Sequence, residues 1–185
     1  PNSITAMSNY YRVEQSGLMA DRSYERVSRV HLRRLARIAD EEREDFFARR
    51  PDWRLLYRRR LLCTILHGQS ALHYCNGTSG IDGFDICLFF AAHAEAPFPH
   101  HWSGYRDFGK SKFGRREADQ GYAGRRIRFT GRSLACRPSD DPVAALQTYL
   151  SVGRSPTARR IRDNPVVLIA PQRYLGYVAW PTLVA

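Results

Sequence analysis

The pattern of hydrophobic and polar positions predicts helices in the first third of the chain. Between residues 22 and 62, apolar residues recur at helical spacing among many arginines, which is typical of amphipathic helices. An acidic run that begins at Asp40 predicts the start of a second helix, because acids favour the positive end of the helix dipole. Pro51 predicts a break, and we expect a third helix from Trp53 to about Leu62.

The middle of the chain contains its clearest strand. The run Phe84–Phe90 is apolar almost throughout, which is typical of a strand that is covered on both faces. Asp85 interrupts this run, and a carboxylate there is costly unless it is paired, hydrogen-bonded or bound to a metal. Residues 70–74 are expected to form one or two helical turns before the strand.

The last third alternates strands with helix-start signals. Asp140 or Asp141, followed by Pro142, predicts the N-terminus of a helix, and Ser155-Pro156 repeats the signal. Strands are expected near residues 64–67, 84–91, 125–130, 166–170 and 174–180. The sequence therefore predicts an α/β or α+β fold in which N-terminal helices pack on a small mixed β-sheet.

The length of 185 residues predicts one globular domain, which we expect to cover residues 21–185. Residues 1–20 are polar and lack a clear period, which predicts a flexible arm, and the residues before Met7 are expected to be partly an added leader. Four scattered cysteines favour a reducing compartment. No signal peptide or membrane-spanning run is evident, so we expect a cytoplasmic protein with no membrane partner.

The net charge of +11 favours anionic partners such as nucleotides or nucleic acid, although a solvated basic surface without a partner is the alternative. The segment Asp107–Arg116 alternates glycine, basic and aromatic residues. Lys110, Lys112 and Arg115 are therefore candidates for contacts with a polyphosphate or a nucleic-acid backbone. A flexible surface loop explains the same segment equally well.

Residues 63–103 contain no lysine or arginine, yet they hold Asp82, Asp85 and five of the six histidines. A strand, a glycine turn at Gly68, a short helix and a strand with an acid near its start follow one another. This order resembles the nucleotidyltransferase superfamily. The order of segments, including the runs 107–115 and 124–134, also resembles that of a bacterial group of no known activity.

The resemblance implies a site for a nucleoside triphosphate and Mg²⁺. Gly68 and Ser70, with Gln69 inserted between them, would hold the nucleotide phosphates. Asp85 would bind the metal with help from Asp82, and the reaction would be nucleotidyl transfer to an acceptor that the sequence does not identify.

Two positions depart from the pattern of that superfamily. Gly83 stands where the first metal-binding acid is expected, and Arg128 stands where the third is expected. Two-metal catalysis needs carboxylates that converge on ions about 3.5–4 Å apart, whereas Arg128 would attract phosphate. The alternative is therefore a catalytically degenerate protein that binds nucleic acid or docks an acidic protein. A direct ion pair between Asp85 and Arg128 would favour this alternative.

Other chemistries have less support from spacing. A histidine-rich loop could ligate a metal, but it lacks helical ligand spacing. Two nucleophile–histidine pairs lack an orienting third group or a nucleophile-elbow motif. These weaker candidates are His93, Glu95, His100 and His101 for the metal, and Cys75–His73 and Ser70–His67 for the nucleophiles.

Overall fold

A six-stranded mixed sheet lies at the centre of the computed structural model, which describes residues 26–77, 81, 83–98, 103–109 and 126–181. The strand order is β3-β4-β2-β1-β5-β6. β2 and β4 are parallel, and the other neighbouring strands are antiparallel. The strands are β1 (Leu61–His67), β2 (Gly83–Ala91), β3 (Ser103–Asp107), β4 (Arg126–Leu134), β5 (Val166–Ala170) and β6 (Val178–Trp180).

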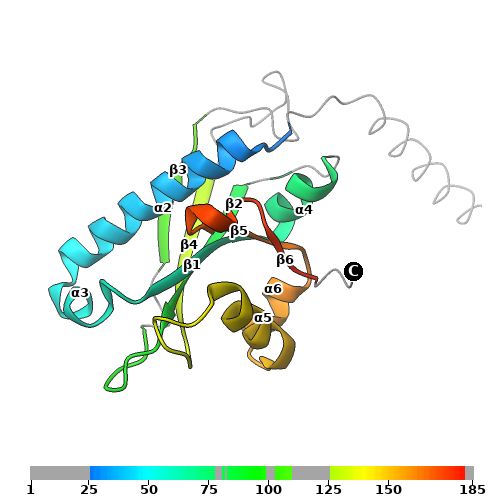
Figure 1. The fold of residues 1–185 in the computed structure, drawn as a ribbon. Coiled ribbons are helices and arrows are strands. Elements are labelled where there is room, and N and C mark those ends of the chain that lie inside the picture. Colours follow the sequence, from blue (N-terminus) through cyan, green and yellow to red (C-terminus); the bar gives the residue numbers. More distant parts are fainter. Residues whose placement is uncertain (1–25, 78–80, 82, 99–102, 110–125, 182–185) are drawn as a thin grey trace, which may run out of the picture.

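Helices cover both faces of this sheet (Figure 1). On one face lie α2 and α4, and on the other lie α5 and α6. A 3₁₀ turn, η1, precedes β6. The helical elements are α2 (Arg29–Arg49), α3 (Pro51–Tyr57), α4 (Gly68–Asn76), α5 (Pro142–Val152), α6 (Pro156–Arg162) and η1 (Gln172–Tyr174). Helices together with a mixed sheet confirm the predicted fold class.

The central strand β2 separates two hydrophobic clusters. Phe84, Ile86, Leu88 and Phe90 pack in the cluster beneath α2, while the alternate residues from Cys87 onward pack beneath α5 and α6. Successive side chains of a strand point to opposite faces, so an unbroken apolar run suits a strand covered on both sides. The prediction of a doubly covered strand is therefore confirmed.

Both predicted helix starts in the last third are confirmed. The Asp141 carboxylate accepts a hydrogen bond from the backbone N–H of Ala144 at 2.8 Å, and Pro142 is the first residue of α5. Ser155 caps α6 in the same way through the N–H of Ala158. Each side chain satisfies a backbone donor that has no partner within its helix.

The N-terminal helix boundaries were predicted wrongly. α2 continues through Asp40 without a break, because the apolar residues on both sides of it bury one common stripe against the sheet. α3 begins at Pro51 but ends at Tyr57, and Leu61 and Leu62 open β1 instead of closing a helix. The acidic run therefore lies inside a helix rather than at its start.

All five predicted strands are present, but β1 begins earlier and β4 ends later than predicted, and two larger differences remain. β3 was not predicted, because Tyr105 and Arg106 give no apolar run that would mark an edge strand. The last strand was predicted too long, since η1 occupies residues 172–174 and only Val178–Trp180 pairs with β5. The predicted N-terminal arm, residues 1–20, lies outside the described residues.

Candidate functional site

Four polar residues form a row across four neighbouring strands. His67 of β1 pairs in register with Asp85 of β2, Asp85 pairs with Arg128 of β4, and Arg128 pairs with Tyr105 of β3. Residues opposite one another in register share a face of the sheet. The sheet topology therefore brings together side chains that are up to 61 positions apart in the sequence, counted from His67 to Arg128.

An ion pair lies at the centre of this row. Nε of Arg128 donates a hydrogen bond to Oδ1 of Asp85 at 2.8 Å, and Nη2 lies 2.6 Å from the same oxygen in an ion pair. The two side chains retain 48% and 30% of their full exposure respectively, so neither is sealed from solvent. The carboxylate in the apolar strand thus has the cationic partner that its position demanded, and that partner is a side chain.

A depression of about 500 Å³ opens over the pair. Besides the ion pair, its lining includes one cation–π pair, in which the Arg126 guanidinium lies 5.1 Å from the centre of the Tyr105 ring. Arg126 and Tyr105 are exposed. The lining residues are Gln69, Gly83, Phe84, Asp85, Tyr105, Arg126 and Arg128. Among the described residues of this lining, two arginines stand against one carboxylate, which leaves a net positive charge.

The first residues of α4 do not all face the depression, although they were predicted to bind phosphate together. Ser70 is buried, and its hydroxyl donates to the backbone carbonyl of His67 at 3.1 Å. Gly68 has a φ of 70°, and a Cβ there would stand 3.1 Å from Oδ2 of Asp85. The glycine therefore allows close approach of the carboxylate. Of the three predicted phosphate-binding residues, Gln69 lines the depression, whereas the Ser70 hydroxyl is committed to the backbone.

His67 closes the other end of the row and is only 6% exposed. Its pKa is lowered to about 4, mainly by burial and with a contribution from the charges of Arg160 and Arg128, while the Asp85 carboxylate opposes the shift. His67 is therefore neutral at pH 7 and adds no charge of its own. The exposed Arg160, on α6, extends the positive surroundings beyond it.

Several predicted site residues cannot be placed. Asp82, Lys110, Lys112 and Arg115 lie outside the described residues, as do the two histidines of the loop at 100–101.

The described residues do not fit a two-metal site. They contain no group of three His, Cys, Asp or Glu side chains that could hold a metal ion. Asp85 is the one carboxylate that the described residues contribute to the lining of the depression, and a guanidinium contacts its Oδ1. A cation in that place would have to compete with Arg128. The Mg²⁺ assigned to Asp85 and Asp82 by resemblance thus remains a prediction.

The weaker chemical candidates gain no support from their surroundings. Desolvation raises the pKa of the Cys75 thiol, which disfavours the reactive thiolate. Nδ1 of His93 accepts a hydrogen bond from the backbone N–H of Glu95 at 3.2 Å, so that lone pair is used locally.

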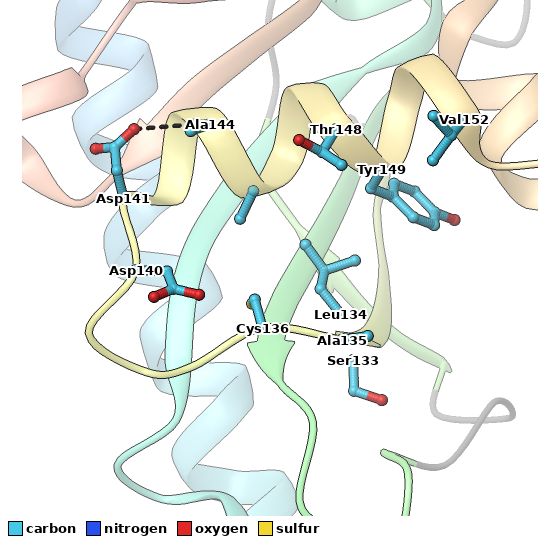
Figure 2. Close-up of a pocket in the computed structure, with 11 residues that line it drawn as sticks. Ser133, Leu134, Ala135, Cys136, Asp140, Asp141, Ala144, Thr148, Tyr149 and Val152 are labelled. Carbon is cyan, nitrogen blue, oxygen red and sulfur yellow. Dashed lines mark hydrogen bonds between the residues drawn. The ribbon is translucent and has the colours of Figure 1, made fainter.

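A second depression, of about 600 Å³, lies between α5 and the end of β4 (Figure 2). Apolar side chains such as Leu134, Tyr149 and Val152 form most of its lining. Its two acids are already engaged: Asp141 accepts from the Ala144 N–H and the Tyr174 hydroxyl, and Asp140 accepts from a backbone N–H. This depression contains none of the predicted site residues and no basic side chain.

Sequence reasoning did not include Arg126 and Tyr105, the two exposed side chains of the lining that could contact a ligand. The alternation of Arg126 and Arg128 with Ile127 and Phe129 was a usable signal, because it places both arginines on one face of a strand. Tyr105 gave no such signal, since its strand was not predicted.

The chain matches no family model, no curated protein and no solved structure. Among the described residues, no helix combines the length and the apolar character that crossing a membrane requires. The assignment of function therefore rests on the geometry of the depression.

Proposed function

We propose that the depression around Arg128 binds phosphate groups of a nucleotide or nucleic acid, without a metal-dependent reaction. The observation that carries this proposal is the position of Arg128 opposite Asp85. An arginine where a third metal-binding acid would be expected suits phosphate, because the planar guanidinium offers several N–H donors in a fixed geometry.

The charges of the depression support the same proposal. Arg128 contacts Asp85 through a hydrogen bond from Nε and an ion pair at Nη2, and among the described residues its other side-chain donors have no hydrogen-bond partner. Arg126 contributes a second guanidinium, which contacts the Tyr105 ring and has no ion pair with an acid among the described residues. A phosphate that enters the depression would meet both cations and would displace little protein structure.

The hypothesis of a common origin with the nucleotidyltransferase superfamily is supported by the order of elements. β1, α4 and β2 follow one another, Gly68 begins the helix, and Asp85 lies near the start of the second strand. The Asp85–Arg128 ion pair favours the degenerate alternative, because the arginine neutralises the carboxylate that a metal would otherwise neutralise. Nucleotidyl transfer would require Asp82 to complete the site.

Calorimetric titration with tripolyphosphate and with ATP, in the presence and absence of Mg²⁺, tests this proposal. We expect binding that does not require Mg²⁺ and that weakens as salt rises. Arg128→Gln should lower the affinity by about tenfold, as expected for loss of a charge-assisted hydrogen bond. Arg59→Gln is the matched control, because Arg59 is exposed near the end of α3 and lies outside the lining of the depression.

Two outcomes would contradict the proposal. Equal losses in Arg128→Gln and Arg59→Gln would mean that the anion binds by net charge alone. Binding of ATP that requires Mg²⁺ would instead support the metal-dependent site and its prediction of nucleotidyl transfer.

A further inference from the structure

The most unusual exposed side chain near the depression is Tyr105. Its residue is 57% exposed although it lies on a strand of the central sheet. β3 is the edge strand, and Tyr105 faces the same side as Arg128, its register partner in β4. An aromatic ring is thus displayed beside the cation to which we assign phosphate.

Arg126 holds this ring in place. Its guanidinium lies 5.1 Å from the ring centre, which is cation–π distance, and Arg126 is itself exposed. A guanidinium plane and an aromatic ring both offer flat surfaces on which a nucleic-acid base can stack. The pair therefore provides a stacking platform at the rim of the depression.

The dimensions of the row favour a strand over a single phosphate group. His67 and Tyr105 are separated by three inter-strand gaps, which together span about 14 Å. Arg126 places positive charge beside Tyr105 at one end, and the charge of Arg160 acts on His67 at the other. A ligand with several phosphates along an extended backbone matches this distribution of charge.

We infer that the site takes a single-stranded nucleic acid, with an unpaired base stacked on Tyr105 and neighbouring phosphates contacting Arg126 and Arg128. This inference rests on the proposed function and specifies its ligand class. A duplex keeps its bases stacked on one another, so it cannot present a free base face to Tyr105. A mononucleotide can supply the base, but it lacks the extended backbone.

Fluorescence anisotropy with a short dye-labelled oligothymidylate tests the inference. Tyr105→Ala should weaken binding of this strand by about 5- to 150-fold, the range expected for loss of one base–aromatic stack. Tyr105→Phe keeps the ring and should bind within about twofold of wild type. The duplex with oligoadenylate and the mononucleotide thymidine monophosphate should both bind more weakly than the strand, and the duplex should not respond to Tyr105→Ala.

Tripolyphosphate separates failure of this inference from failure of the proposed function. If tripolyphosphate binding depends on Arg128 but Tyr105→Ala binds the strand as Tyr105→Phe does, stacking is wrong and phosphate binding stands. A duplex or mononucleotide that binds as tightly as the strand would overturn the single-strand assignment. If wild type binds neither tripolyphosphate nor the strand, the proposed function itself fails. Circular dichroism and thermal unfolding check that both variants are folded.

Discussion

Two arginine–carboxylate pairs lie on opposite faces of the same sheet edge, and they differ in what surrounds them. Arg106 of β3 donates from Nε to Glu42 of α2 at 2.6 Å and also pairs with Asp45. Arg128 of β4 pairs with Asp85 on the other face. The Glu42 side chain is only 5% exposed, whereas that of Asp85 is 30% exposed.

The difference in exposure indicates that the two ion pairs have different roles. Around Glu42, two acids meet Arg106 and Arg49, so the charges are balanced within the protein. Gly104 lets β3 approach closely, because a Cβ there would collide with the Glu42 carboxylate. Around Asp85, the part of the chain that the structure describes supplies one acid and more than one arginine facing a depression. The first pair fixes β3 to α2, and the second leaves positive charge available to a ligand.

Removal of Arg106 should produce the largest change in stability. Arg106→Ala leaves the buried Glu42 carboxylate without its short hydrogen bond, which should cost about 2–3 kcal/mol of unfolding free energy. Arg128→Ala is the matched control, and because its pair is half-exposed it should cost less than about 1 kcal/mol. Urea unfolding measures both. Equal losses would show that the two pairs do not differ in the way proposed here.

The pH dependence of stability should distinguish the two ion pairs further, because the neutral His67 lies beside Asp85 of the more exposed pair. Its folded pKa of about 4 lies below the ordinary value of 6.5, so the unfolded chain takes up the proton first as the pH falls. The stabilisation is therefore complete above pH 6.5 and decreases toward pH 4. Between pH 6.5 and 4.5 we expect a loss of about 2 kcal/mol from this group.

His67→Gln removes the titrating group and is the comparison for that experiment. Unfolding free energies of wild type and variant, measured by urea across the same pH range, should converge as the pH falls. If the unfolding free energies of the two proteins change equally between pH 6.5 and 4.5, burial of a neutral His67 is not the cause of the pH dependence.

The sequence predicted the features that depend on local patterns, but not those that depend on contacts between distant residues. The fold class, the strand around Phe84–Phe90 and the caps at Asp141 and Ser155 follow from local patterns of apolar and turn residues. The acidic run near Glu42 led to a wrong helix boundary. The buried Glu42 is paired with Arg106, which lies 64 residues later in the chain. A tertiary ion pair of this kind leaves no local signal.

The candidate site was predictable to a similar degree. Asp85 stood out because a carboxylate in an apolar strand needs a cation. Which cation it meets depends on the parallel register of β2 and β4, which spacing alone does not determine. Tyr105 was missed for the same reason, since only its pairing with β4 brings it to the depression.

The most direct test of the central claim is the affinity of Asp85→Asn for tripolyphosphate, measured by calorimetry without added metal. Asp85 competes with a phosphate for Arg128, so removal of its charge should tighten binding by about fivefold, or about 1 kcal/mol. Glu41→Gln removes the same charge from an exposed position on α2 and should leave the affinity within about twofold. Tighter binding in Asp85→Asn alone is the predicted result, and weaker or abolished binding in that variant would contradict the account.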